Sequence, residues 1–178
     1  MCIFPRSCLP AHRSPAMKNG FTLIEMMIVL SVLAIGLAIA MPALTTVIEG
    51  NRMTGTANQL LGDLYLARSE AVRSGRSVEV CASTNAQTCS NLATDWSQGW
   101  IVRAAASGTL LAVHQPASTF QASATWSSLR FSPSGEVRSS AGAANRLAAQ
   151  TTITLSNAHA SRTVEIAPYG HAAIRGAQ

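Results

Sequence analysis

The chain has 178 residues, which is enough for one domain with one modest hydrophobic core and too short for two. Its formal net charge is +5, but three of the thirteen basic residues precede Phe21. The remaining chain carries ten arginines and eight acids, a balance of +2, which does not by itself indicate a nucleic-acid-binding protein.

Residues 1–20 contain three prolines and no apolar periodicity, so we expect them to be unstructured. Their basic residues are Arg6, Arg13 and Lys18. By the positive-inside rule these charges keep the N-terminus in the cytoplasm and direct the following chain across the membrane. Met17 is an alternative start, which would leave only four residues before Phe21.

The stretch from Met26 to Ile48 is 23 residues long and has no charged side chain. As a helix it would reach about 35 Å, enough to cross the hydrocarbon core of a bilayer, which is about 30 Å thick. We therefore predict a membrane-spanning helix over residues 21–48. Glu25 lies at its start, and an ionisable group at that depth is costly enough to indicate a function.

The helix is predicted to continue through residues 49–75, where the pattern becomes amphipathic. The apolar positions recur at spacings of three and four: Met53, Ala57, Leu60, Leu61, Leu64, Ala67, Ala71 and Val72. The opposite, solvent-facing side is predicted to carry Arg52, Asp63, Arg68, Glu70 and Arg73. Gly75 is a plausible C-cap.

Residues 76–178 consist of short β-prone runs separated by Ser, Gly, Asn and Pro. The predicted strands are Ser77–Cys81, Trp100–Arg103, Leu110–His114, Thr125–Phe131, Thr151–Ser156, Thr163–Ala167 and Ala172–Arg175. Trp126 is out of phase with Leu129 and Phe131, so a bulge or an irregular stretch is expected there. Turns are expected at residues 132–135 and 168–170, and a loop at 139–149. The predicted fold class is α+β, a long N-terminal helix packed on an antiparallel sheet.

No residue pattern points to catalysis. Apart from the first 20 residues, the chain has three histidines, and none has an acid or a cysteine at the spacing of a catalytic triad or a metal site. We therefore predict that the protein is not an enzyme and needs no cofactor. Trp96 and Trp100 are interpreted as core aromatics rather than a stacking platform for a ligand.

The segment from Lys18 to Glu25 resembles the class III signal of type IV pilins and pseudopilins. In that family a dedicated aspartyl peptidase cuts after the glycine, and the new N-terminal aromatic residue is N-methylated. The resemblance implies that Gly20 ends the leader, that Phe21 is the methylated N-terminus, and that Glu25 is the fifth mature residue. Pro42 falls where the family has a helix-loosening proline.

Two simpler interpretations of the same segment remain open. A plain N-terminal anchor would explain the length of the apolar run but not Gly20 or Glu25. A secretory signal cleaved at Ala38-Ile39-Ala40 would place Glu25 awkwardly at the start of its apolar region.

The remainder of the chain resembles the GspH/FimT family of minor pseudopilins. The resemblance rests on Leu66–Gly75 followed by Val78, Val80 and Cys81, then Cys89, Trp96–Val102 and Phe131–Gly135. It implies a periplasmic head, residues 49–178, on a single-pass inner-membrane subunit that enters a filament near its tip. The implied partners are other pilin or pseudopilin subunits, the prepilin peptidase/N-methyltransferase and inner-membrane lipid. Type II secretion pseudopili and type IV pili share every motif quoted.

The resemblance also gives Glu25 a partner. In a filament, its carboxylate would pair with the methylated amine of Phe21 on an adjacent subunit, because a charge left alone in low dielectric is costly. The alternative is that Glu25 lies hydrated at headgroup depth.

Some FimT-type minor pilins bind DNA through a Gly-Arg-x-Arg pattern on the C-terminal hairpin. Here Gly170 is followed by His171, Ala172 and Ala173, so both arginine positions are lost. Arg162, His171 and Arg175 remain candidate phosphate contacts. DNA is therefore a possible partner that the sequence does not favour.

In the periplasm, where disulfides persist, Cys81 and Cys89 are predicted to form a bridge. On the chain-entropy model, closing so short a loop contributes about 2.5 kcal/mol. A metal site is the alternative, although two cysteines without a nearby histidine would make a poor one.

Overall fold

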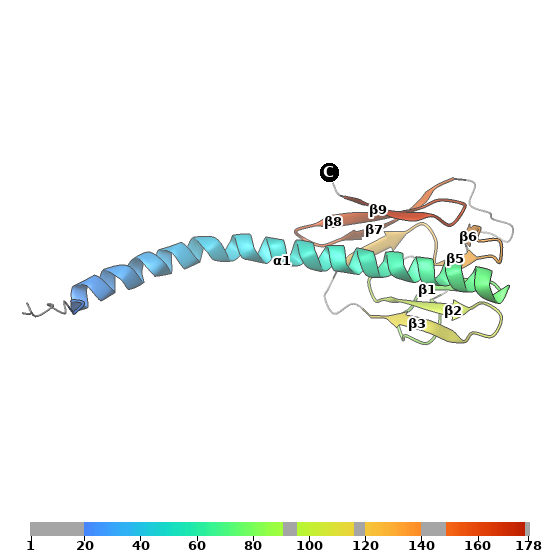
Figure 1. Ribbon diagram of the computed structural model, residues 1–178, viewed down its shortest axis with the longest axis horizontal. Helices are drawn as coiled ribbons and strands as arrows, with labels where there is room; N and C mark the ends of the chain where they lie inside the picture. Colours follow the sequence, from blue (N-terminus) through green and yellow to red (C-terminus); the bar gives the residue numbers. More distant parts are fainter. Residues whose placement is uncertain (1–19, 91–95, 116–119, 140–148, 177–178) are drawn as a thin grey trace, which may run out of the picture. The chain divides into compact units, whose positions relative to one another are not determined.

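The computed structural model describes residues 20–90, 96–115, 120–139 and 149–176. The predictions for residues 1–19 and most of the expected loop at 139–149 lie outside this range. The chain divides into two compact units, residues 1–41 and residues 42–178. In the described part there is one helix, α1 (Leu23–Ser74), and nine strands (Figure 1).

Helix α1 begins and ends at residues whose side chains or backbone suit helix termini. Thr22 precedes the helix, and its Oγ1 accepts a hydrogen bond of 3.2 Å from the backbone N of Glu25. At the other end Gly75 has φ +65°, the left-handed conformation that a C-terminal glycine adopts without steric cost. The predicted end of the helix is confirmed.

Within the second unit, the helix packs one face on the strands. Its buried residues are Met53, Ala57, Leu60, Asp63, Leu64, Ala67 and Ala71. Two predictions about this face are wrong. Val72 is exposed because it lies one position past Ala71, about 100° round the helix. Asp63 is buried because it follows Leu60 by three residues and so lies on the same apolar stripe.

The strands form two antiparallel sheets, and the single sheet that was expected is therefore corrected to two. The five-stranded sheet has the order β3-β2-β1-β5-β6, and the four-stranded sheet has the order β4-β7-β8-β9. The first contains β1 (Val78–Ala82), β2 (Trp100–Ala104), β3 (Leu110–His114), β5 (Ser128–Phe131) and β6 (Val137–Ser139). The second contains β4 (Gln121–Ala124), β7 (Thr151–Ser156), β8 (Ser161–Ile166) and β9 (Ala172–Gly176).

The segment predicted as one strand, Thr125–Phe131, is where the chain passes from one sheet to the other. β4 ends at Ala124 in the four-stranded sheet and β5 starts at Ser128 in the five-stranded sheet. Trp126 lies between them, buried, with its indole Nε1 donating to Thr151 Oγ1 at 2.7 Å. Of the two alternatives that the phase mismatch left open, the structure shows the irregular stretch, at a change of sheet, and not the bulge.

One hydrophobic core joins the helix to both sheets. The five-stranded sheet contributes Val78, Val80, Ala82, Trp100 and Val102, and the four-stranded sheet contributes Ile153, Leu155, Val164 and Ile166. In Figure 1 the helical segment of the second unit lies along these strands, with β8 and β9 on one side of it and β2 and β3 on the other. The predicted α+β class is confirmed.

Asp63 connects the helix to the five-stranded sheet. Its Oδ2 accepts a hydrogen bond of 2.8 Å from the indole Nε1 of the buried Trp100. His114 stacks on Trp100, with the two ring centroids 4.3 Å apart. Burial lowers the pKa of His114, and the charge of Asp63 partly opposes this effect. The imidazole is therefore neutral at pH 7.

We predict that Asp63→Leu lowers the free energy of unfolding by about 1–3 kcal/mol, because the buried indole N–H of Trp100 loses its acceptor. Asp63→Asn is the matched control, since it keeps an acceptor oxygen and should cost clearly less. Urea unfolding of the full chain in detergent, followed by tryptophan fluorescence, measures both. Equal losses in the two variants would contradict this role for the hydrogen bond.

Candidate functional site

The most unusual surface of the chain is the apolar first half of α1. In the part of the chain that the structure describes, α1 is the one helix long and apolar enough to cross a membrane. None of its most apolar window is buried, and large side chains from Phe21 to Ile48 are exposed. A water-soluble protein rarely leaves so large an apolar surface uncovered, so this segment requires lipid or other helices around it.

Gly20 and Phe21 lie immediately before this helix and in no secondary structure. Both are exposed, and 77% of the Phe21 surface is accessible. A peptidase binds its substrate as an extended segment, and these two residues are free of the helical hydrogen bonds that would have to break. Thr22 then caps the helix.

Glu25 lies in the first turn of α1. Its spacing from Thr22 is that of a capping box, in which a Ser or Thr N-cap is followed three residues later by Glu or Gln. Sequence reasoning missed this spacing, although the pattern Thr-Leu-Ile-Glu was visible. A carboxylate in the first turn also interacts favourably with the helix dipole. No cation forms an ion pair with Glu25 in residues 20–90, 96–115, 120–139 or 149–176.

The C-terminal hairpin does not bring the candidate phosphate contacts together. In the β8–β9 register, Thr163 pairs with Arg175, and Arg162 pairs with Gly176. Neighbouring residues of a strand point to opposite faces, so Arg162 and Arg175 lie on opposite faces of the sheet. The Arg175 Nε also forms an ion pair of 2.7 Å with Glu165 Oε2.

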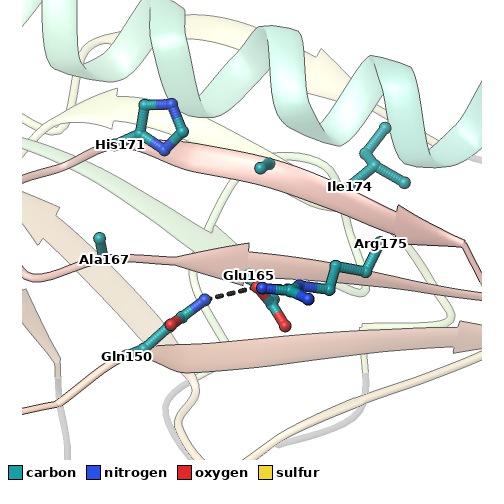
Figure 2. A pocket seen from close by; sticks show the side chains of 7 residues that line it. Gln150, Glu165, Ala167, His171, Ile174 and Arg175 are labelled. Carbon is teal, nitrogen blue, oxygen red and sulfur yellow. Dashed lines mark hydrogen bonds and ion pairs between the residues drawn. The ribbon is translucent and has the colours of Figure 1, made fainter.

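A shallow pocket of about 520 Å³ lies at this hairpin, and Figure 2 shows its side chains. Arg175 reaches toward Glu165 and Gln150, while His171 lies at the other end of the pocket. The charge of the arginine is thus largely balanced within the chain. Among the described residues, no group of three or more His, Cys, Asp or Glu side chains is placed to hold a metal ion.

Cys81 and Cys89 form the expected disulfide, with their Cα atoms 5.5 Å apart. Cys81 is buried in β1, so the bridge ties the following loop to a central strand of the five-stranded sheet. Asn85 organises the loop from within, since its Oδ1 accepts hydrogen bonds from the backbone N of Gln87 and Thr88 at 3.0 and 2.8 Å. Trp96 beyond the loop is buried and packs edge-on against Trp126, as expected for a core aromatic.

Comparison with known families matches both parts of the chain. The model of the type II transport protein GspH matches residues 56–170, which is more than half of the chain. The chain belongs to the GspH family. The prokaryotic N-terminal methylation motif matches residues 15–41, a range that contains Gly20, Phe21 and Glu25. The GspH match ends at Gly170, so β9 with Arg175 lies outside it.

Two solved structures have the same fold, both of the type IV minor pilin FimU of Pseudomonas aeruginosa strain PAO1. The crystal form in space group P65 gives a TM-score of 0.52 at 22% identity, covering 68% of this chain and 91% of FimU. The form in P21 gives 0.54 at 22% identity, covering 70% and 89%. No curated protein sequence matches the chain significantly. The GspH-family chain thus has a pilin fold, and its apolar helix and methylation motif fit a membrane-anchored pilin-like subunit.

We predict that replacing both cysteines by alanine lowers the free energy of unfolding by about 2.5 kcal/mol, because the unfolded chain regains the entropy of the open loop. The same loss should appear when the unaltered chain is unfolded in urea with a reductant. Asn85→Ala, which removes the internal hydrogen bonds and keeps the bridge, is the matched comparison. If reduction leaves the urea midpoint unchanged, the bridge does not hold this loop.

Proposed function

We propose that this GspH-family chain is a minor, non-enzymatic subunit of a type II secretion pseudopilus or a type IV pilus, placed near the filament tip. The observation that carries the proposal is an exposed apolar helix joined to a methylation motif at one end and to a folded pilin head at the other. The exposed apolar half of α1 is a surface through which such a chain can assemble with the helices of other subunits. Membership of a family of structural subunits supports a role without catalysis.

The first proposed step is processing at the membrane. A prepilin peptidase removes residues 1–20 by cleavage after Gly20, and the new N-terminus at Phe21 is methylated. Residues 21–48 then cross the inner membrane and residues 49–178 form the periplasmic head, with the second half of the helix at 49–75. The exposed, non-helical conformation of Gly20 and Phe21 supports access to the peptidase.

The second proposed step is assembly, in which the apolar half of α1 exchanges lipid for the helices of other subunits. This exchange has little hydrophobic cost or gain, because lipid tails are as apolar as leucine side chains. Specificity must then come from a polar group, and Glu25 is the only charged residue in the segment from Phe21 to Ile48. Cleavage creates the cation that the described chain does not offer it, the amine of an N-terminal residue on a neighbouring subunit.

Binding to double-stranded DNA, the alternative function, has weaker support. Arg175 is paired with Glu165, and Arg162 lies on the other face of the hairpin. A phosphate backbone lying on either face of the hairpin would contact only one of these two arginines. Such a contact gives weak, strongly salt-dependent binding at most. The genes adjacent to this one, a minor-pilin operon or a secretion operon, would decide which machine the subunit serves.

The processing step predicts a mature chain that begins at Phe21 and carries one methyl group on its N-terminal nitrogen. Mass spectrometry of the protein purified from membranes of its native host measures both features. A chain that begins at Met41 would instead show cleavage as an ordinary secretory signal and would contradict the proposal.

The assembly step predicts that Glu25→Gln enters filaments at least tenfold less often than the unaltered chain, because an unpaired buried charge costs several kcal/mol and 1.4 kcal/mol is already a factor of about ten. Glutamine keeps the capping-box side chain, so the helix start is preserved. Quantitative immunoblotting of sheared filaments and of membranes measures incorporation.

Two variants separate the charge from the cap. Thr22→Ala removes the capping hydroxyl and keeps the carboxylate, so it should cost about 1 kcal/mol of helix stability but should still assemble. Normal incorporation of Glu25→Gln together with failure of Thr22→Ala would show that Glu25 acts only in helix initiation.

A further inference from the structure

The outer face of the five-stranded sheet carries a row of charged residues in direct cross-strand register. Glu79 on β1 is paired with Arg103 on β2 and with Arg130 on β5, and Arg130 is paired in turn with Arg138 on β6. Four adjacent strands therefore contribute one charge each to the same face, three arginines and one glutamate. We call these four residues the arginine row.

Glu79 is buried, and its carboxylate accepts hydrogen bonds from both neighbouring strands, β2 and β5. Its Oε2 accepts hydrogen bonds from Arg103 Nε at 3.1 Å and Nη2 at 2.9 Å, and its Oε1 accepts one from Ser128 Oγ at 2.9 Å. Only 26% of the Arg103 side chain is accessible. Arg103 therefore has a structural role, because a buried carboxylate requires a cation as its partner.

Arg130 and Arg138, unlike Arg103, have weak partners or none in the described chain. Among the described residues Arg130 has one ion pair, which is long, 3.5 Å from Nη2 to Glu79 Oε1, and 52% of its side chain is accessible. Arg138 is exposed and has no hydrogen-bond or ion-pair partner among the described residues. Directly opposed positions of antiparallel strands place their Cβ atoms about 5 Å apart, where like charges repel. An oxyanion bound between the two guanidinium groups would relieve this repulsion.

We propose that Arg130 and Arg138 form a docking site for a carboxylate side chain of an adjacent protein subunit. This inference rests on the proposed function, because it needs a neighbour in a filament. The planar guanidinium group of an arginine can donate two parallel hydrogen bonds to the two oxygens of a carboxylate. The contact between Arg130 and Glu79 on the neighbouring strand β1 helps fix the orientation of the Arg130 guanidinium. The site thus binds an aspartate or glutamate on a neighbouring protein surface.

The distribution of the other arginines favours a protein carboxylate over the phosphates of a duplex. Arg52, Arg73 and Arg175 are each paired with a glutamate of the same chain, on the helix or on the other sheet. These three charges are therefore balanced within the chain and do not extend the arginine row. DNA presents a charge about every 1.7 Å along its axis, and two arginines would neutralise few of them.

The absence of lysine from residues 21–178 provides a residue-level test. Arg138→Lys and Arg130→Lys each keep the positive charge and introduce the sole lysine of the processed chain. A carbodiimide joins a lysine amine to a carboxylate only when the two are in contact. Filaments sheared from the native host are treated with the carbodiimide, digested and analysed by mass spectrometry.

In both variants we expect an amide bond from the introduced lysine to an aspartate or glutamate of another filament subunit. Arg76→Lys is the matched control, another exposed arginine without a partner in the described chain, and should give no such product. The reversal Arg138→Glu should lower incorporation by about tenfold and Arg76→Glu should leave it unchanged. Products confined to the chain's own carboxylates, or no product from either lysine variant, would overturn the inference.

Two further outcomes are distinguishable from these. If the unaltered chain is absent from filaments, the proposed function fails and the docking site fails with it, whereas incorporation without the cross-link removes the docking site alone. The purified full chain in neutral detergent is also titrated with a duplex of about 30 base pairs at two salt concentrations. Salt-sensitive binding that Arg138→Glu abolishes and Arg76→Glu does not would assign the site to phosphate and overturn the carboxylate proposal.

Discussion

The apolar surface from Phe21 to Ile48 has to be kept away from water, yet its large side chains are exposed in the described chain. This constraint explains why the chain has two compact units of different character. The first is a helix that is stable only in lipid or among other helices, and the second is a head with its own core and disulfide. In the proposed assembly, such a subunit moves from membrane to filament without refolding, because both environments satisfy the same apolar helix.

Two carboxylates are buried in the head and accept hydrogen bonds there. Asp63 accepts one from the indole N–H of Trp100, and Glu79 accepts hydrogen bonds from Arg103 and Ser128 on the outer face of the five-stranded sheet. Each of these two has its partner within the chain, as a buried acid must. Glu25 lies at a helix terminus and has no cation beside it in the described chain, and this difference is what the proposed pairing with another subunit would account for.

The sequence predicted the helix and its end at Gly75 because apolar spacing and a C-terminal glycine are local signals. It also predicted strands and turns of the head, and the bridge between Cys81 and Cys89, from short-range patterns. It missed the division into two sheets, because strand partners are set by contacts between distant segments. The same limit applies to the charges: Glu79 and Arg103 are distant in the chain from the hairpin that carries Arg130 and Arg138, and only the register of four strands puts them in one row.

Contact between the start of α1 and the N-terminus of a neighbouring subunit, through Glu25, is the proposal on which the others depend. A photo-reactive benzoylphenylalanine in place of the exposed Ile24 tests it directly, since its ketone reacts with whatever lies next to Glu25. Irradiation of assembled filaments should give an adduct that maps to the first mature residues of another pilin-like chain. Adducts with lipid alone, in filaments that contain the subunit, would contradict this contact.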